Sequence, residues 1–326
     1  MEQLSEAREH SEQREYREQR EHRKYSEHRK YSEHSEHSEP VYLNVINEEA
    51  FKFYAYHIVC NKLALSKLPD IPHVIVLNCS DNNLTYLPDM PLLTELNCSF
   101  NKLTQLPDMP LLTKLKCSNN QLTTLPDMPL VTILHCGYNQ LTTLPNIPLL
   151  IELHCSCNQL TQLPDIPYVT ELFCDSNMLD QLPHMPQLTA LACCDNNFTQ
   201  LPDMLHLKEL YCDNNYLRQL PSIPHVIMLR CANNRFTQLP YLPQLKYLDC
   251  SGNRIEILSN MPLLENLNCE YNKIIQLSDM PNMIRLYCRN NRLVHLPRMR
   301  KLKTLDCRGN RIRILPNLPN PLNAHL

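Results

Sequence analysis

The sequence has 326 residues, of which 43% are hydrophobic, with 31 Lys and Arg against 34 Asp and Glu and a formal net charge of −3. No apolar run approaches the ~20 residues that cross a bilayer as a helix, which argues against a transmembrane protein. The three glycines, Gly137, Gly252 and Gly309, are too few and too scattered for a glycine-rich loop that cradles a phosphate.

Residues 1–40 form a low-complexity segment in which the triplet Ser-Glu-His recurs. Its 11 acidic and 8 basic residues account for the whole formal charge of −3. Because so few of its side chains are apolar, we predict a disordered tail or a frayed single helix. Its five histidines are interpreted as solvated rather than metal-binding. The segment is charged from Glu2 onward and has no apolar signal core, so we expect no secretion by that route.

Residues 41–60 have a different character, rich in aromatic and aliphatic residues. Asn47 is a good N-cap for a short helix whose first turn carries two glutamates. Phe51 and Tyr54 would then face the neighbouring coil. We predict an N-terminal helical cap and a first degenerate coil here, because a solenoid needs a cover at its open end.

Residues 61–326 repeat a unit of 19 residues without an insertion. The cysteine of the unit recurs at Cys60, Cys79, Cys98, Cys117, Cys136, Cys155, Cys174, Cys193, Cys212, Cys231, Cys250, Cys269, Cys288 and Cys307. An asparagine follows three residues later, from Asn82 through Asn310. A fixed period of this length predicts a solenoid in which each coil buries its apolar face against the next.

One unit, residues 93–111, shows how a coil should fold. Leu96 and Cys98 are two residues apart, so on a strand they point to the same side. Stacked in register, such strands would form a parallel sheet of about fourteen strands at a spacing of ~4.8 Å. The return segment Leu-Pro-Asp-Met-Pro carries two prolines three residues apart, which favours extended, polyproline-like chain over a helix. We therefore predict a sheet on one side of the coil, an extended return on the other, and little helix.

The cysteine and asparagine columns both need a physical reason. A buried Asn is tolerated only when its amide is hydrogen-bonded, so Asn101 and its equivalents are expected to bridge backbone groups of adjacent coils. Fourteen of the 16 cysteines occupy the inward strand position, where a free thiol acts as a small hydrophobe. We interpret them as reduced core thiols in a cytosol-like compartment. The two off-column cysteines, Cys157 and Cys194, are expected to be accessible.

The motif L-x-x-L-x-C-x-x-N-x-L-x-x-L-P resembles the leucine-rich repeat. The family resemblance implies a right-handed coil of the α/β type of leucine-rich repeat, with the parallel sheet on the concave side. Leu-Pro-x-x-Pro is similar to the short repeats of secreted bacterial effectors, and the 19-residue unit with its cysteine is similar to leucine-rich-repeat proteins of giant amoeba-infecting DNA viruses. The bacterial effectors often add a C-terminal ubiquitin-ligase domain. Four residues follow the last unit, which ends at Leu322, so we expect no such domain.

The outward strand positions, the third and fifth of each unit, vary while the inward positions do not. Aromatic residues and Arg are enriched at interface hot spots, which makes them candidates for partner binding; aromatic residues also suit any strand surface. The candidates are Phe173, Tyr211, Met228, Arg230, Tyr247, Arg285 and Tyr287.

A metal site is a minor alternative on the same surface. His135 and His154 occupy the same position on neighbouring coils, with Glu152 and Cys157 close in sequence. Imidazole, carboxylate and thiolate are all metal ligands. A polar sheet surface that contains two histidines is more common, so no metal and no cofactor is assigned.

Charge is unevenly distributed along the chain. Residues 41–229 have 8 Lys and Arg against 17 Asp and Glu, whereas residues 230–313 have 15 against 6. Much of the surplus lies at the tenth position of five successive units, which we call the basic edge: Arg235, Arg254, Lys273, Arg292 and Arg311. Stacked bases repel unless they are solvated or paired. A solvated edge is the first interpretation, an acidic protein partner the second, and nucleic acid the least favoured, since no compact nucleic-acid motif is present.

These observations together predict a non-enzymatic module that binds a protein partner on its concave surface, in a host cytoplasm and in virus–host interaction as the resemblance implies. Every loop has one length, and no Ser-His-Asp or paired-carboxylate arrangement stands out, so no enzyme activity is expected. One alternative is a substrate-recognition adaptor for a ubiquitin ligase, and another is a structural protein packed in a particle. The sequence assigns neither the partner's identity nor an oligomeric state.

Overall fold

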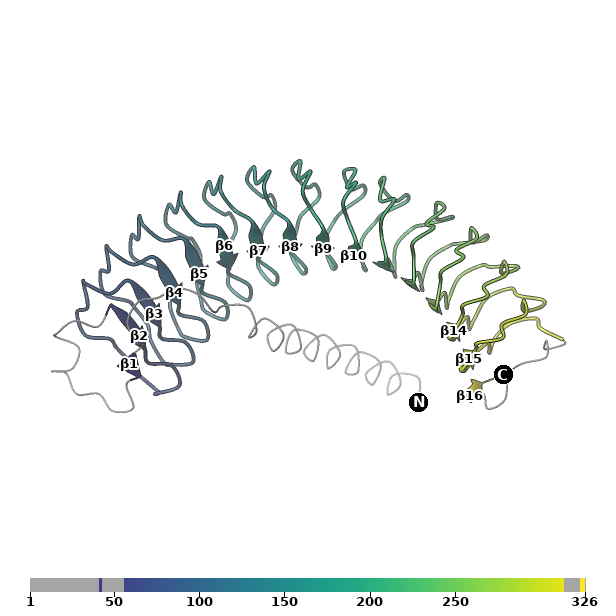
Figure 1. Cartoon of the computed structure of the whole chain (residues 1–326), viewed down its shortest axis with the longest axis horizontal. Coiled ribbons are helices and arrows are strands. Elements are labelled where there is room, and N and C mark those ends of the chain that lie inside the picture. The colour runs from purple at the N-terminus through teal and green to yellow at the C-terminus, as the bar shows by residue number, and fades with distance from the viewer. Residues whose placement is uncertain (1–40, 43–55, 314–322, 326) are drawn as a thin grey trace. The chain divides into compact units, whose positions relative to one another are not determined.

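The computed structural model describes residues 41–42, 56–313 and 323–325, all within one compact unit, Pro40–Leu326. This unit is a solenoid whose coils each contribute one short strand to a single parallel sheet (Figure 1). The strands are β1 (Val41–Tyr42), β2 (His57–Val59), β3 (Val76–Asn78), β4 (Glu95–Asn97), β5 (Lys114–Lys116), β6 (Ile133–His135), β7 (Glu152–His154), β8 (Glu171–Phe173), β9 (Ala190–Ala192), β10 (Glu209–Tyr211), β11 (Met228–Arg230), β12 (Tyr247–Asp249), β13 (Asn266–Asn268), β14 (Arg285–Tyr287), β15 (Thr304–Asp306) and β16 (Asn323–His325). Their order in the sheet is their order in the chain.

The length of the unit sets the register of the sheet. From β2 to β16 each strand residue pairs with the residue 19 positions later, as Leu96 pairs with Leu115 and Leu115 with Leu134. Equivalent side chains therefore stack directly above one another along the sheet. Within the solenoid, successive coils follow a curve, and the strands line its inner side (Figure 1).

The return segment owes its path to its two prolines. The N–H of Leu112 donates to the carbonyl oxygen of Met109 at 3.1 Å, which closes a turn with Pro110 at its second position. Proline has the φ that this position requires. Pro107 keeps the preceding chain out of an α-helix, because it lacks an N–H and clashes with the previous turn. The described residues contain no helix, in agreement with the predicted extended return segment.

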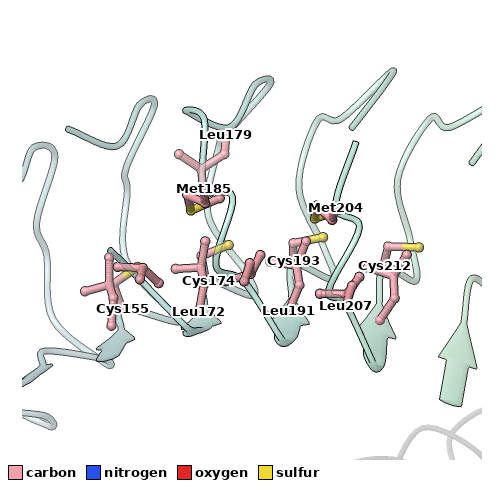
Figure 2. Close-up of a cluster of buried hydrophobic side chains, with 14 of the residues drawn as sticks. Cys155, Leu172, Cys174, Leu179, Met185, Leu191, Cys193, Met204, Leu207 and Cys212 are labelled. Atoms are coloured by element: carbon pink, nitrogen blue, oxygen red, sulfur yellow. The ribbon is translucent and has the colours of Figure 1, made fainter. Parts of the chain in front are cut away.

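The core is a column of apolar side chains from the inward strand positions and the return segment. In the coil that begins at Leu93, the side chains of Leu96, Cys98, Leu103 and Met109 are fully or almost fully buried. Figure 2 shows the same arrangement further along the chain. There the cysteines of the column, which we call the ladder cysteines, lie beside leucine and methionine side chains of their own and adjacent coils, as at Cys174 and Cys193. All fourteen ladder cysteines are buried, as the sequence predicts. Burial raises the pKa of the Cys98 and Cys136 thiols to about 12, because the core disfavours the thiolate.

The asparagine column joins consecutive coils through both ends of the amide. Asn101 donates through Nδ2 to the carbonyl oxygens of Cys79 and Cys98 at 3.0 and 3.1 Å, and its Oδ1 accepts from the N–H of Leu84 at 2.9 Å. The same three contacts recur from Asn120 to Asn310. The predicted bridging role of the column is confirmed.

A left-handed residue stands just before the asparagine in each coil. Its φ is 58° at both Phe100 and Cys157, and 65° at Gly252. A Cβ at Gly252 would lie 2.1 Å from the Oδ1 atom of Asn233, so glycine fits a close approach between coils there. The aromatic residues at this position carry a conformational cost on the order of 1 kcal/mol, which the surrounding hydrogen bonds must offset.

Two of the predicted segments fall largely outside the described residues. The tail, residues 1–40, and residues 43–55, where the cap helix is expected, are not described, and both stay predictions. Inside the predicted cap, β1 pairs in parallel with β2. Within the described part of the chain, no helix has the length and apolar character to cross a membrane.

Candidate functional site

The candidate site is the outward side of the sheet, which we call the sheet face. It consists of the first and third residue of each strand, whose side chains point away from the core. Most of them are half-buried by their neighbours above and below, as the burial of β4 and β7 illustrates. In the middle of the sheet these side chains and their neighbours form three adjoining groups.

The first group is a stack of rings on β6, β7 and β8. The His135 and His154 rings lie 4.1 Å apart between centroids, at an interplanar angle of 6°. The Phe173 ring continues the stack at 4.4 Å from His154 and 18°. The register explains the stack, because these three residues occupy one position on consecutive strands.

Two carboxylates lie beside the stacked imidazoles. Glu152 Oε1 is 2.7 Å from His135 Nε2 and 3.3 Å from His154 Nε2, and Glu171 Oε1 is 3.5 Å from His154 Nε2. Burial lowers the pKa of His135, against the opposing effect of the Glu152 hydrogen bond. The hydrogen bond from His135 lowers the pKa of Glu152 despite the partial burial of its carboxyl. The site thus pairs a neutral imidazole with an ionised carboxylate near pH 7.

The structure brings together three of the four residues that the sequence offered for a metal. Ligand atoms of His135, Glu152 and His154 lie within 4.8 Å of one another. Cys157 does not belong to this group, because the chain leaves the sheet before reaching it and turns with a left-handed residue there. The carboxylate of Glu171 lies beside the group instead. The sequence analysis did not propose Glu171, although its position on the strand of the next coil could have pointed to it.

The second group is an apolar cluster on the sheet face, separate from the main core. It contains the buried side chains of Ala192, Cys194 and Tyr211, with Phe173 and Met228 packed against them. Tyr211 is 6% exposed, and its hydroxyl oxygen lies 2.6 Å from the Met228 sulfur. Tyr211 therefore supports this cluster and offers little surface of its own.

The expectation that Cys194 is accessible was wrong. Its residue exposure is 7%, and burial within the cluster raises the pKa of its thiol well above the ordinary value. The prediction rested on the place of Cys194 next to a column cysteine, outside the inward position that the column occupies. The side chains of adjacent coils cover it there.

The third group is a buried ion pair next to the cluster. Arg230 on β11 lies with its guanidinium 2.9 Å from the carboxylate of Asp213, whose side chain is almost completely buried. Asp213 also accepts a hydrogen bond from the N–H of Ala232 at 2.8 Å. Burial opposes the charge of Arg230, but Asp213 and Asp249 outweigh it and hold the Arg230 pKa above its ordinary value. The guanidinium of Arg230 is thus engaged mainly by this ion pair within the protein.

The exposed part of the predicted binding set lies toward the C-terminal end of the sheet. Arg285 is exposed and donates to the Asn266 side-chain oxygen at 3.1 Å. Tyr287 is 37% exposed, and Tyr247 is half-buried. Arg285 and Tyr287 are therefore the exposed members of the set.

The basic edge lies at the turn that follows the strands. Arg218, Arg235, Thr237 and Arg254 line a hollow of about 290 Å³. The Arg235 guanidinium lies over the Tyr216 ring, 4.6 Å from its centroid, in a cation–π arrangement that limits its freedom. Arg292 and Arg311 are exposed and Lys273 is half-buried. Sequence reasoning missed Arg218, which stands at the twelfth position of its unit rather than the tenth.

No protein-family model matches the sequence, and no curated protein matches it. A solved structure of YopM, a leucine-rich effector protein from Yersinia pestis, is similar to the chain over 83% of its length and 88% of the YopM chain, with 32% identity and a TM-score of 0.71. The chain belongs to the leucine-rich-repeat family. A leucine-rich-repeat protein of Leptospira interrogans shares the fold at 23% identity and a TM-score of 0.64, covering 84% of this chain and 95% of that one.

The cysteine column of this leucine-rich-repeat protein also has a counterpart among solved structures. The functional domain of InlJ from Listeria monocytogenes is described as including a cysteine ladder. It matches 67% of this chain and 63% of its own, at 26% identity and a TM-score of 0.50. A cysteine ladder is thus named in another protein of similar structure.

Proposed function

We propose that this leucine-rich-repeat protein is a non-enzymatic binding module that holds a protein partner against its sheet face. The single observation that supports this most is the apolar cluster of Ala192, Cys194, Tyr211, Phe173 and Met228, which packs on the outward side of the sheet. Two of its members, Phe173 and Met228, are only half-buried and reach the surface, where aromatic and large apolar side chains are typical of interfaces.

The half-buried Phe173 and Met228 at the surface of this cluster would form the apolar centre of the interface. Arg285, Tyr287 and Tyr247 lie further along the sheet and would form its C-terminal part. The charge of the neighbourhood favours a partner with acidic groups, because residues 230–313 carry 15 basic against 6 acidic residues. Such complementarity raises the association rate and selects the partner.

A role between a pathogen and its host is the finer part of the proposal. YopM is named as an effector protein of Yersinia pestis, and the resemblance to viral repeats that the 19-residue unit suggested from its sequence alone fits the same kind of role. We place the protein in a host cytoplasm in this proposal. The sixteen free cysteines, fifteen of them buried, suit a reducing compartment.

The test is partner capture by the full-length protein from cells that produce it, with one sheet-face variant and one matched control. The variant Tyr247→Ala/Arg285→Ala/Tyr287→Ala removes two tyrosines and one arginine from the sheet face. The control Tyr168→Ala/Tyr241→Ala/Arg298→Ala removes the same residue types from exposed places on the return segments. We expect a protein that the wild type and the control retain and the sheet-face variant loses. Equal retention by both variants would contradict the proposal.

A further inference from the structure

The His135, Glu152 and His154 side chains form a group that the protein-binding proposal does not use. They come from two adjacent strands, in which His135 pairs with His154 in register. The sheet spacing alone places the two imidazoles close together, and Glu152 reaches between them from the third position of the same coil as His154. Three ligand-type atoms converge within 4.8 Å as a result.

The surroundings hold these groups in place before any ligand arrives. His135 is buried to 7% exposure, and His154 is held between the rings of His135 and Phe173. Glu152 is half-buried, with 28% of its side chain exposed, which leaves a path from solvent to the group. Half-buried ligand groups with one side open to solvent suit a small ion that keeps one coordination position free.

One nitrogen of the group has close carboxylate neighbours but, in the part of the chain that the structure describes, no hydrogen bond. His154 Nε2 is buried and has no hydrogen-bond partner within the described residues, although it faces the carboxylates of Glu152 and Glu171 at 3.3 and 3.5 Å. Buried polar atoms are almost always paired in folded proteins, so this nitrogen calls for an explanation. An ion between the imidazole nitrogens and the carboxylate would provide the missing partner.

We propose that His135 Nε2, His154 Nε2 and a Glu152 carboxylate oxygen bind one divalent transition-metal ion of the zinc class. Two imidazoles and one carboxylate are a donor set suited to Zn²⁺, and Co²⁺ accepts the same set. Three protein ligands leave a fourth position, which Glu171 or a water molecule fills. The site goes beyond the proposed function, since it needs no protein partner.

The geometry also predicts that the site is of moderate affinity. The two rings are nearly parallel, so their in-plane lone pairs do not converge, and the rings must tilt toward each other to share one ion. His135 donates from Nε2 to Glu152 in the ion-free state and must place its proton on Nδ1 when Nε2 binds metal. Nδ1 is buried and has no hydrogen-bond partner in the described part of the chain. Metal-binding histidines usually have one, and its absence weakens the site.

The test uses the full chain with Co²⁺ and Zn²⁺ as probes. Histidines of the tail are themselves metal ligands, so every protein carries glutamine at His10, His22, His28, His34 and His37 as a common background. Calorimetric titration gives the stoichiometry and affinity, and the absorption spectrum of the Co²⁺ form gives the ligand type. We expect one ion per chain and visible bands of nitrogen and oxygen ligation, without the near-ultraviolet thiolate-to-cobalt band that a cysteine ligand produces.

Four variants make the assignment specific. His135→Gln/His154→Gln should abolish the site, and His184→Gln/His206→Gln, which removes two exposed histidines elsewhere, should leave it intact. Glu152→Gln keeps the shape of the side chain and should weaken binding by at least about 10-fold, because losing a direct ligand should cost no less than losing a residue that only supports one. Cys157→Ser should change nothing.

Thermal melts confirm that each variant is folded, and Glu152→Gln supplies a result even if the double histidine variant does not fold. No bound ion in the background protein would overturn the proposal. An affinity that Glu152→Gln leaves unchanged would overturn it as well. A thiolate band that Cys157→Ser removes would move the site to Cys157 and contradict the assignment.

Discussion

Asn158 donates through Nδ2 to the carbonyl oxygen of Cys136, 22 residues earlier in the chain, at 3.0 Å. The same amide donates to Cys155 in its own coil at 3.0 Å, and its Oδ1 accepts from the N–H of Leu141 at 3.0 Å. One buried side chain thus satisfies three backbone groups on two coils. The cysteine and asparagine columns belong together, because the backbone around each small thiol is what the neighbouring amides bind.

Replacing Asn158 by alanine should lower the free energy of unfolding by about 1–3 kcal/mol, because buried backbone groups lose their partners. Urea denaturation followed by circular dichroism measures the change. The control is Asn260→Ala at an exposed position, which should stay within about 0.5 kcal/mol of the wild type. Equal effects of the two substitutions would show that the column adds nothing to stability.

The buried thiols should make the protein sensitive to alkali. Burial raises the pKa of Cys136 from 9.0 to about 12. The unfolded chain therefore releases this proton at a lower pH than the folded chain does. The stabilisation that follows is complete below pH ~9 and is lost as the pH rises toward the folded-state pKa, at about 1.4 kcal/mol per pH unit for each such thiol.

Cys136→Ala should accordingly reduce the slope of unfolding free energy against pH by about 1.4 kcal/mol per unit between pH ~10 and ~11, measured under reducing conditions. Leu141→Ala is the matched control, since it also leaves a cavity in the core but removes no titrating group. It should lower stability equally at every pH in this range. An identical slope in wild type and Cys136→Ala would refute the account of the ladder thiols.

Thiol modification should distinguish the two off-column cysteines. Cys157 is half-buried, whereas Cys194 is buried in one cluster with Tyr211 and Ala192. We expect one fast-reacting thiol in the described residues of the native protein, lost in Cys157→Ser, because burial limits both access and thiolate formation. Tyr211→Ala should uncover Cys194 and add a second fast thiol. Fast reaction of Cys194 in the wild type would contradict the burial of the cluster.

Charge reversal tests the basic edge. Arg235→Glu/Arg254→Glu/Arg292→Glu should leave the fold intact, since all three side chains are exposed, at a cost of about 0.5 kcal/mol or less per site. Association with an acidic protein partner should slow, and more so at low salt. A linear fall of log affinity with log salt, by nearly one unit per phosphate contacted, would point to nucleic acid instead. Unchanged rates at every salt concentration would identify a solvated edge.

The fold could be predicted from the sequence because its signal repeats in every coil. Leu96, Cys98 and Asn101 recur at one spacing, and each position has one physical role, so periodicity gives strand, register and core together. The sheet face was harder to predict. Tyr211 stands at an outward position, yet its neighbours on adjacent coils bury it, and Arg230 is half-buried in an ion pair. Both outcomes depend on side-chain packing between coils that the repeat pattern does not encode.

The candidate metal group was likewise only partly predictable from the sequence. The sequence places His135 and His154 at one position on neighbouring coils, and the ring stacking follows from that placement. The exclusion of Cys157 and the approach of Glu171 depend on where the chain turns away from the sheet and on the rotamer of each side chain. Those details required the structure.

The central claim, that a protein partner lies against the sheet face, is tested most directly by site-specific photo-crosslinking of the full-length protein. A photoreactive phenylalanine analogue replaces one tyrosine at a time: Tyr247 and Tyr287 on the sheet face, and Tyr168 and Tyr241 on the return segments as controls. We predict crosslinks to one protein partner from Tyr247 and Tyr287 and none from the two controls. Crosslinks to that partner from Tyr168 and Tyr241, with none from the sheet-face positions, would contradict the account.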